Sequence, residues 1–94
     1  MIKRFREILS AEAAAILAIP VSDSAEKAVH ALYQCKGKLF TCGIGKAGYV
    51  AKKAASTFST TGTPSVFLHP ADAPHGDVGV VQKGDILLAL SNSG

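Results

Sequence analysis

The sequence contains little of what would assign it to the nucleic-acid-binding proteins. It has no tryptophan and only 6% aromatic residues, and its formal net charge is a modest +3. Domains that bind nucleic acid carry clustered Lys and Arg on one face or along one helix. The lysines here are scattered and form no basic run, so nucleic acid is not expected as a partner.

Cysteine is also scarce. Cys35 and Cys42 are the two thiols of the chain, and their separation fits neither a zinc knuckle nor a Cys-x-x-Cys redox pair. We therefore expect two reduced and mostly buried thiols, as is usual in a cytoplasmic protein.

Long apolar runs are missing as well. No uninterrupted stretch approaches the roughly 18 apolar residues of a membrane-spanning helix. The N-terminal segment carries Lys3, Arg4 and Arg6, but Glu7 and Glu12 interrupt the apolar residues that follow, unlike in a signal peptide. The sequence therefore predicts no membrane partner and a cytoplasmic location.

The first third of the chain has helical periodicity. Apolar residues recur at helical spacing from Phe5 to Leu17, ahead of Pro20, and again over residues 25–33. An Asp-x-x-Glu pattern at residues 23–26 resembles a capping box, and Gly37 is the expected C-terminal cap. Residues 1–37 are thus predicted to form an N-terminal helical segment.

Strand and helix patterns alternate over the remaining residues, 38–94. Strands are predicted over 39–42, 65–68 and 86–90, a helix over 47–58, and a short helical turn within 69–77. This order predicts an α/β fold with a doubly wound parallel sheet of flavodoxin-like layering. The continuous apolar run of the last strand suits a position in the middle of a sheet covered on both faces. Because the chain ends directly after that strand, we expect only the N-terminal portion of the domain, with about three strands.

The most informative motif is the Gly-x-Gly-x-x-Gly turn formed by Gly43, Gly45 and Gly48, with Lys46 inside it. It joins a predicted strand to a predicted helix. Such a turn lets backbone N–H groups approach an anion at a helix N-terminus, where the helix dipole also favours negative charge. The motif therefore predicts an anion site in which Lys46 neutralises a phosphate or a developing oxyanion.

Two nucleotide-binding interpretations fit this turn poorly. A dinucleotide site needs an acidic residue at the end of the second strand, where this sequence has His69, with Asp72 further on inside the loop. A Walker A loop needs Ser or Thr where Ala47 stands and a first glycine where Phe40 stands. No cofactor is expected.

The other two predicted strands are also followed by polar residues. The loop after the second strand contains His75, which can handle protons near neutral pH, and the last strand leads into Ser91, Asn92 and Ser93. Because parallel strands end at the same edge of a sheet, the three segments are expected to converge there. The close spacing of His69 and His75 makes them weak metal candidates, but no ligand spacing is matched and no metal is expected.

Together these motifs resemble the SIS (sugar isomerase) domain family, and within it the arabinose 5-phosphate isomerases. The matching segments are Gly43–Gly48, Phe58–Pro64, His69–Pro70, His75–Gly79 and Ser91–Gly94. The resemblance implies catalytic roles for Lys46 and His75, and binding of a sugar phosphate by Gly43, Gly45, Lys46, Ser91, Asn92 and Ser93. It also implies a glutamate just beyond the serine segment, which this sequence does not contain.

The resemblance implies an intramolecular oxidoreductase that interconverts D-arabinose 5-phosphate and D-ribulose 5-phosphate for the synthesis of Kdo and lipopolysaccharide, here as a truncated chain. The alternative is a phosphosugar-binding SIS module without catalysis, as in regulators. In both cases the expected partners are a small phosphosugar and further copies of the chain in a homo-oligomer.

Overall fold

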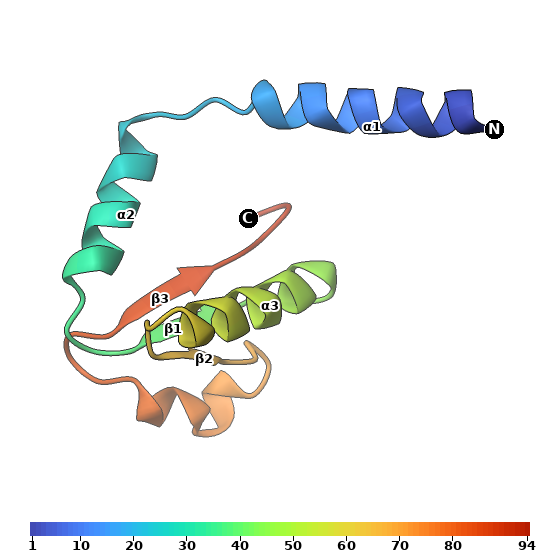
Figure 1. Ribbon diagram of the computed structural model, residues 1–94. Helices are drawn as coiled ribbons and strands as arrows, with labels where there is room; N and C mark the ends of the chain where they lie inside the picture. Colours follow the sequence, from blue (N-terminus) through green and yellow to red (C-terminus); the bar gives the residue numbers. More distant parts are fainter.

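The computed structural model describes residues 1–94 and contains three helices, two short 3-10 turns and a three-stranded sheet (Figure 1). The elements follow in the order α1 (Ile2–Leu17), α2 (Asp23–Gln34), β1 (Leu39–Cys42), α3 (Lys46–Thr60), β2 (Ser65–Phe67), η1 (Ala73–His75), η2 (Asp77–Val80) and β3 (Ile86–Ala89). This is the predicted order of elements, with boundaries within a residue or two of the expected ones for most elements.

All three strands are parallel, and β1 lies between β2 and β3. The register pairs Leu39 with Ser65 on one side and with Ile86 on the other. The expected α/β fold with a parallel sheet is confirmed. Its consequence for function is that the segments following β1, β2 and β3 all leave the sheet at one edge.

α3 packs on the sheet over its apolar, alanine-rich face, as predicted. Ala51 and Ala55 are buried there, and Ala51 is fully inaccessible. The hydroxyl of Thr41, also fully buried, donates a 2.7 Å hydrogen bond to the backbone oxygen of Ala51. Because small side chains let a helix approach a sheet closely, this contact fixes α3 and the turn before it against β1.

Two predicted helix caps are wrong. Asp23 is the first residue of α2 rather than its N-cap, which is Ser22, and no side chain caps the helix; the Ser22 hydroxyl pairs with that of Ser24 at 2.7 Å. The helix ends at Cys35 in an extended conformation, and Gly37 does not have the positive φ of a C-terminal cap. A side chain at Gly37 would lie 2.9 Å from the backbone oxygen of Gly84, so this glycine permits a close approach of two chain segments.

Asp85 ties the start of β3 to the start of β1. Its carboxylate accepts 2.7 Å hydrogen bonds from the backbone N–H groups of Lys38 and Gln82, and the Lys38 ammonium lies 3.6 Å away. The Asp85 side chain is only 2% exposed. The N–H bond from Lys38, the one from Gln82 and the Lys38 charge together hold the pKa of Asp85 below its ordinary value.

The expectation that the last strand lies in the middle of the sheet is wrong for this chain. β3 is an edge strand, and Leu87 is 55% exposed on it. The helices α1 and α2 lead away from the sheet (Figure 1), and neither contains a buried residue. None of the helices combines the length and apolarity that crossing a lipid bilayer requires.

Candidate functional site

The glycine turn between β1 and α3 has a separate physical reason for each of its glycines. Side chains at Gly43 and Gly48 would collide with backbone, at 2.8 Å from the oxygen of Ala47 and 2.6 Å from the oxygen of Gly43 respectively. Gly45, the residue that caps α3, has φ +63°, a conformation that residues with a side chain rarely adopt. The turn therefore depends on glycine at all three positions, and residues with side chains there would force it to change shape.

Lys46 is the first residue of α3, and its side chain is exposed. No side chain caps this helix, and no acidic residue lies in its first turn. The first backbone N–H groups of a helix have no partner within the helix, and the helix dipole adds a partial positive charge there. A lysine at this place adds a full positive charge to a position that already favours anions.

The turn and the serine segment line one cleft of about 970 Å³ at the carboxyl edge of the sheet. Its walls are the start of α3 and the residues that follow β3. The lining residues are Gly43, Ile44, Lys46, Ala47, Val50, Leu90, Ser91, Asn92 and Ser93. Five of the six residues proposed from the sequence to bind a sugar phosphate thus lie together, and the predicted convergence of these two strand ends is observed.

The serine segment makes one hydrogen bond that is typical of a helix start. The Ser91 hydroxyl accepts a 2.8 Å hydrogen bond from the backbone N–H of Gly94, three residues on. An N-cap serine makes this same bond to the third residue of a helix. The backbone N–H groups between Ser91 and Gly94 are left available beside the cleft, next to the hydroxyl of Ser93.

A second, smaller hollow of about 130 Å³ lies on the other flank of the turn. Gly45, the sixth proposed residue, lines this hollow rather than the cleft, together with His69 and Lys52. The Lys52 ammonium lies 5.5 Å from the centre of the Tyr49 ring and 5.2 Å from that of Phe67, within cation–π range.

His69 is held at this hollow by the loop after β2. Its Nδ1 accepts a 3.1 Å hydrogen bond from the backbone N–H of Ala71, so in the neutral ring the proton belongs on Nε2. The His69 ring also meets Phe67 edge to face, with centroids 6.1 Å apart. Sequence patterns gave no site role to Lys52, because its position on the polar side of α3 is equally typical of a solvent-exposed lysine.

His75 lines neither the cleft nor the hollow. It belongs to η1 and is exposed, and its catalytic role stays a prediction. No group of three or more His, Cys, Asp or Glu side chains is placed to hold a metal ion. Cys35 and Cys42 are free thiols, and both are half-buried rather than fully buried.

Fold and site together define an α/β protein with a parallel sheet and an anion-favouring cleft at its carboxyl edge. The SIS domain family matches residues 31–94, which include β1, α3, β2, β3 and both walls of the cleft. The chain belongs to the SIS domain family.

Its relatives include isomerases of phosphosugars. The chain is 51% identical over 74 residues to arabinose 5-phosphate isomerase KdsD of Pseudomonas aeruginosa, a match that covers 79% of this chain and 23% of that protein. It is also 51% identical over 63 residues to the KdsD enzyme of Escherichia coli, over 67% of this chain and 19% of the relative. The chain thus spans about a fifth of the length of these curated relatives.

Two solved structures share the fold. One is a putative phosphosugar isomerase from Bacteroides fragilis, described as involved in capsule formation. It aligns with a TM-score of 0.90 at 52% identity, and the alignment covers 98% of this chain and 50% of the Bacteroides fragilis chain. The other is an Escherichia coli protein solved in complex with arabinose 5-phosphate. It aligns with a TM-score of 0.81 at 40% identity, and the alignment covers 97% of this chain and 48% of the Escherichia coli chain.

Proposed function

We propose that this chain supplies the phosphate-binding wall of a phosphosugar aldose–ketose isomerase, with D-arabinose 5-phosphate and D-ribulose 5-phosphate as its substrates. The observation that carries the proposal is the cleft between the start of α3 and the serine segment, which is lined by Lys46 on one side and by Ser91, Asn92 and Ser93 on the other. The relatives named as arabinose 5-phosphate isomerases support the choice of substrate.

In this proposal the phosphate lies between Ser91, Ser93 and the N-terminus of α3. The hydroxyls and free backbone N–H groups donate hydrogen bonds to the phosphate oxygens, and the helix dipole contributes a favourable potential. Lys46 adds the full charge. Hydrogen bonds to a charged group are stronger than neutral ones, so this end of the sugar is held firmly while its other end reacts.

The isomerisation moves one proton between adjacent carbons and one between their oxygens, through an enediolate. As the alternative to its contact with the phosphate, Lys46 is proposed to stabilise the negative charge that develops on oxygen at the other end of the sugar, since it combines a full charge with a position in the cleft. His75 is proposed to move the proton between the sugar oxygens or to assist ring opening. None of the nine residues lining the cleft is an acid, so the base for the carbon-bound proton is assigned to none of them.

The test is conversion of arabinose 5-phosphate to ribulose 5-phosphate in a protein that contains this chain, with binding measured in parallel. Exchange of the carbon-bound proton with deuterium, followed by NMR, reports enediolate formation directly. Turnover that is lost in Lys46→Ala but kept in Lys53→Ala would support the proposal. Binding of the sugar phosphate without turnover or deuterium exchange would overturn it.

A second candidate function is a phosphosugar-binding module without catalysis. The observation that favours it is the same lack of a carboxylate among the residues that line the cleft, since an aldose–ketose isomerase needs a base on carbon. The deuterium-exchange measurement separates the two, because a binding module would leave the carbon-bound proton in place.

A further inference from the structure

The small hollow on the flank of the glycine turn offers a cation but no acid. Its lining residues are Gly45, Gly48, Tyr49, Lys52, Phe67 and His69. Lys52 takes part in neither of the two ion pairs of the molecule, so its ammonium has no carboxylate partner. An unpaired ammonium beside a hollow attracts a negatively charged group.

Two aromatic rings hold Lys52 in place at the hollow. Its ammonium lies 5.5 Å from the ring centre of Tyr49 and 5.2 Å from that of Phe67, and rings attract a cation within about 6 Å of their centre. Phe67 is half-buried in β2, which fixes one side of this arrangement to the sheet. A side chain that is positioned in advance loses less freedom when a ligand binds.

His69 supplies a second donor to the same hollow. Its Nδ1 accepts the backbone N–H of Ala71 at 3.1 Å, so the neutral ring carries its proton on Nε2. That Nε2 makes no hydrogen bond within the molecule, and the half-buried ring meets Phe67 edge to face. Lys52 and His69 therefore both have hydrogen-bond donors to offer to a ligand.

The hollow and the cleft lie on two sides of one turn. Gly45 lines the hollow, and Lys46, the next residue along the chain, lines the cleft. The Cα atoms of consecutive residues are about 3.8 Å apart. At about 130 Å³ the hollow suits one small group, whereas the cleft has about 970 Å³. A ligand held by its phosphate in the cleft therefore has a place for its other end in the hollow.

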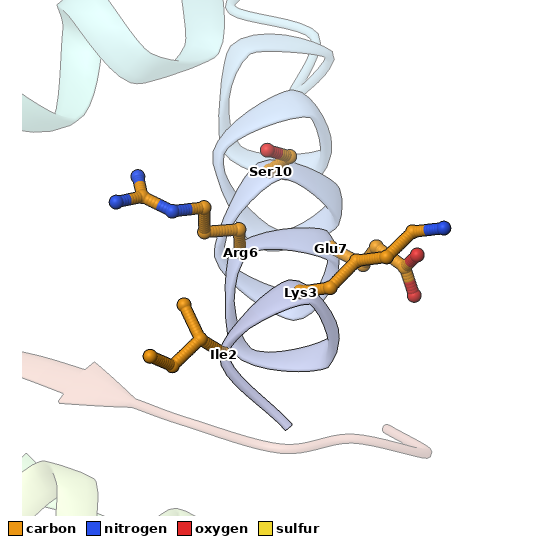
Figure 2. A pocket seen from close by; sticks show the side chains of 5 residues that line it. All are labelled: Ile2, Lys3, Arg6, Glu7 and Ser10. Atoms are coloured by element: carbon orange, nitrogen blue, oxygen red, sulfur yellow. The ribbon is translucent and has the colours of Figure 1, made fainter.

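A larger hollow along α1 lacks these properties. It measures about 640 Å³, and Figure 2 shows that its side chains all come from that one helix. Glu7 is among them and pairs with Arg4 at 3.3 Å, so an acid already balances part of the positive charge there. The hollow beside the turn instead combines an unpaired cation with walls from α3 and from β2 and its following loop.

We propose that the hollow beside the turn binds the oxygen at the reacting end of the sugar phosphate, with Lys52 and His69 as its hydrogen-bond donors. This inference rests on the proposed function, because it takes the phosphate to lie in the cleft. The oxygen gains negative charge in the enediolate, and hydrogen bonds to a charged oxygen are stronger than those to a neutral one. The two donors therefore favour the enediolate over the sugar, and Lys46 serves the phosphate.

A phosphorylated sugar acid tests the hollow without any turnover. Arabinonate 5-phosphate carries a carboxylate where arabinose 5-phosphate has its aldehyde, so it presents a full negative charge at the reacting end. Inorganic phosphate has no second end and reports on the cleft alone. Titrations followed by backbone amide shifts measure the dissociation constants of all three ligands, and the sugar acid should bind more tightly than the sugar.

Lys52→Met is the decisive variant, because it keeps the apolar stem beside the rings and removes the charge. It should raise the dissociation constant for arabinonate 5-phosphate roughly 10-fold or more, the loss expected for a hydrogen bond to a charged group. The constant for inorganic phosphate should not change. Lys53→Met is the matched control, since Lys53 lines neither the hollow nor the cleft, and it should leave both constants unchanged.

Two substitutions of His69 separate its donor from its role in the loop. His69→Asn keeps an acceptor for the N–H of Ala71 but has no donor at the position of Nε2, so it should weaken binding of arabinonate 5-phosphate. His69→Gln carries an amide N–H near that position and should retain more of the affinity. The opposite order of the two variants would remove His69 from the proposal.

Equal effects of Lys52→Met and Lys53→Met would overturn the proposal, because the positive charge would then act without a specific contact. Equal affinities for the sugar and the sugar acid, in a chain that binds inorganic phosphate, would also overturn it while leaving the phosphate site in the cleft. A preference for the sugar acid that depends on Lys52, in a protein without deuterium exchange, would support the hollow and contradict the isomerase function.

Discussion

At the scale of single residues, Lys46 is the side chain whose removal should matter most for ligand binding. It is the only charged residue among those that line the cleft. In Lys46→Ala the dissociation constant for arabinose 5-phosphate should rise between about 10-fold and 100-fold, the loss expected for a hydrogen bond to a charged group. Titration followed by chemical shifts of the backbone amides measures this constant.

Lys53→Ala is the matched control for that experiment. Lys53 is an exposed lysine of the same helix and lines neither the cleft nor the neighbouring hollow. Lys53→Ala and Lys46→Ala each remove one positive charge from the molecule, so both variants share any general electrostatic effect. Equal weakening by the two substitutions would show that Lys46 makes no specific contact with the phosphate.

Asp85 should make the fold sensitive to acid. Its pKa is lowered in the folded state from an ordinary value of 3.8, first by the N–H of Lys38 and next by that of Gln82. The ionised carboxylate therefore stabilises the fold at pH values above the ordinary pKa, and this contribution is lost as the pH falls through the lowered one. Urea unfolding at pH 7, 5 and 3 should show a lower free energy of unfolding at pH 3 than at the other two values. Asp85→Asn should make this difference smaller.

Asp72→Asn serves as the comparison for Asp85, because Asp72 is exposed and its side chain accepts no hydrogen bond among those described. This variant should keep the pH dependence of the unmodified chain. If Asp85→Asn keeps it as well, the contacts of Asp85 do not contribute to acid sensitivity.

Single residues also show how far the site could be predicted. Lys46 was predicted because the glycine spacing around it has a local physical meaning that requires no tertiary contact. Lys52 and His69 were not predicted to meet, since one belongs to α3 and the other follows β2. Only the packing of α3 on the sheet brings them to one hollow, and periodicity does not encode which polar residues of a helix face a neighbouring loop.

At the scale of elements, the turn between β1 and α3 should tolerate no side chain at Gly48. In Gly48→Ala the new methyl group would lie 2.6 Å from the backbone oxygen of Gly43, so strand and helix must move apart. Overpacking of this kind costs about 1–3 kcal/mol in the free energy of unfolding. Urea denaturation of the variant measures the cost, and a weaker affinity for the sugar phosphate should accompany it.

Gly79→Ala is the control for the turn, because no heavy atom lies within 4 Å of the position where its side chain would be, and its φ is not positive. This substitution should change the free energy of unfolding by less than about 0.5 kcal/mol, as is usual for surface positions. A Gly48→Ala chain as stable as Gly79→Ala would mean that the turn relaxes without cost.

The elements themselves were predicted more accurately than their ends and neighbours. β1 matches its predicted range because its apolar run is bounded by the glycine turn, and α3 ends at Thr60, shortly before Gly62, whose φ is +103°. The predicted capping box of α2 was wrong because the helix begins at Asp23 itself, one residue earlier than a cap at Asp23 requires, and Ser22 at the cap position pairs with Ser24. The central position predicted for β3 was wrong for this chain, because an apolar run indicates that a strand requires burial but not which chain or segment supplies it.

At the scale of the whole molecule, the chain divides into a packed part and an extended part. The buried residues belong to β1, α3 and the segments next to them, whereas α1 and α2 contain none. The longest dimension of the molecule is 51 Å against 29 and 27 Å for the other two. The sequence predicted a helical segment over residues 1–37 ahead of the α/β part. It did not predict that these helices leave the sheet, because the apolar residues of α1 and α2 resemble those of any helix that packs on a sheet.

This division should appear as two levels of local stability in native-state hydrogen exchange. The amides of β1, which is hydrogen-bonded on both sides and lines the core, should exchange only through global unfolding. The amides of α1 should exchange far faster in dilute solution, since opening this helix exposes no buried surface of its own chain.

Strong protection of the α1 amides in dilute solution would contradict this prediction. The helix would then be stable without packing, and its exposed apolar side chains would have no role in holding it together.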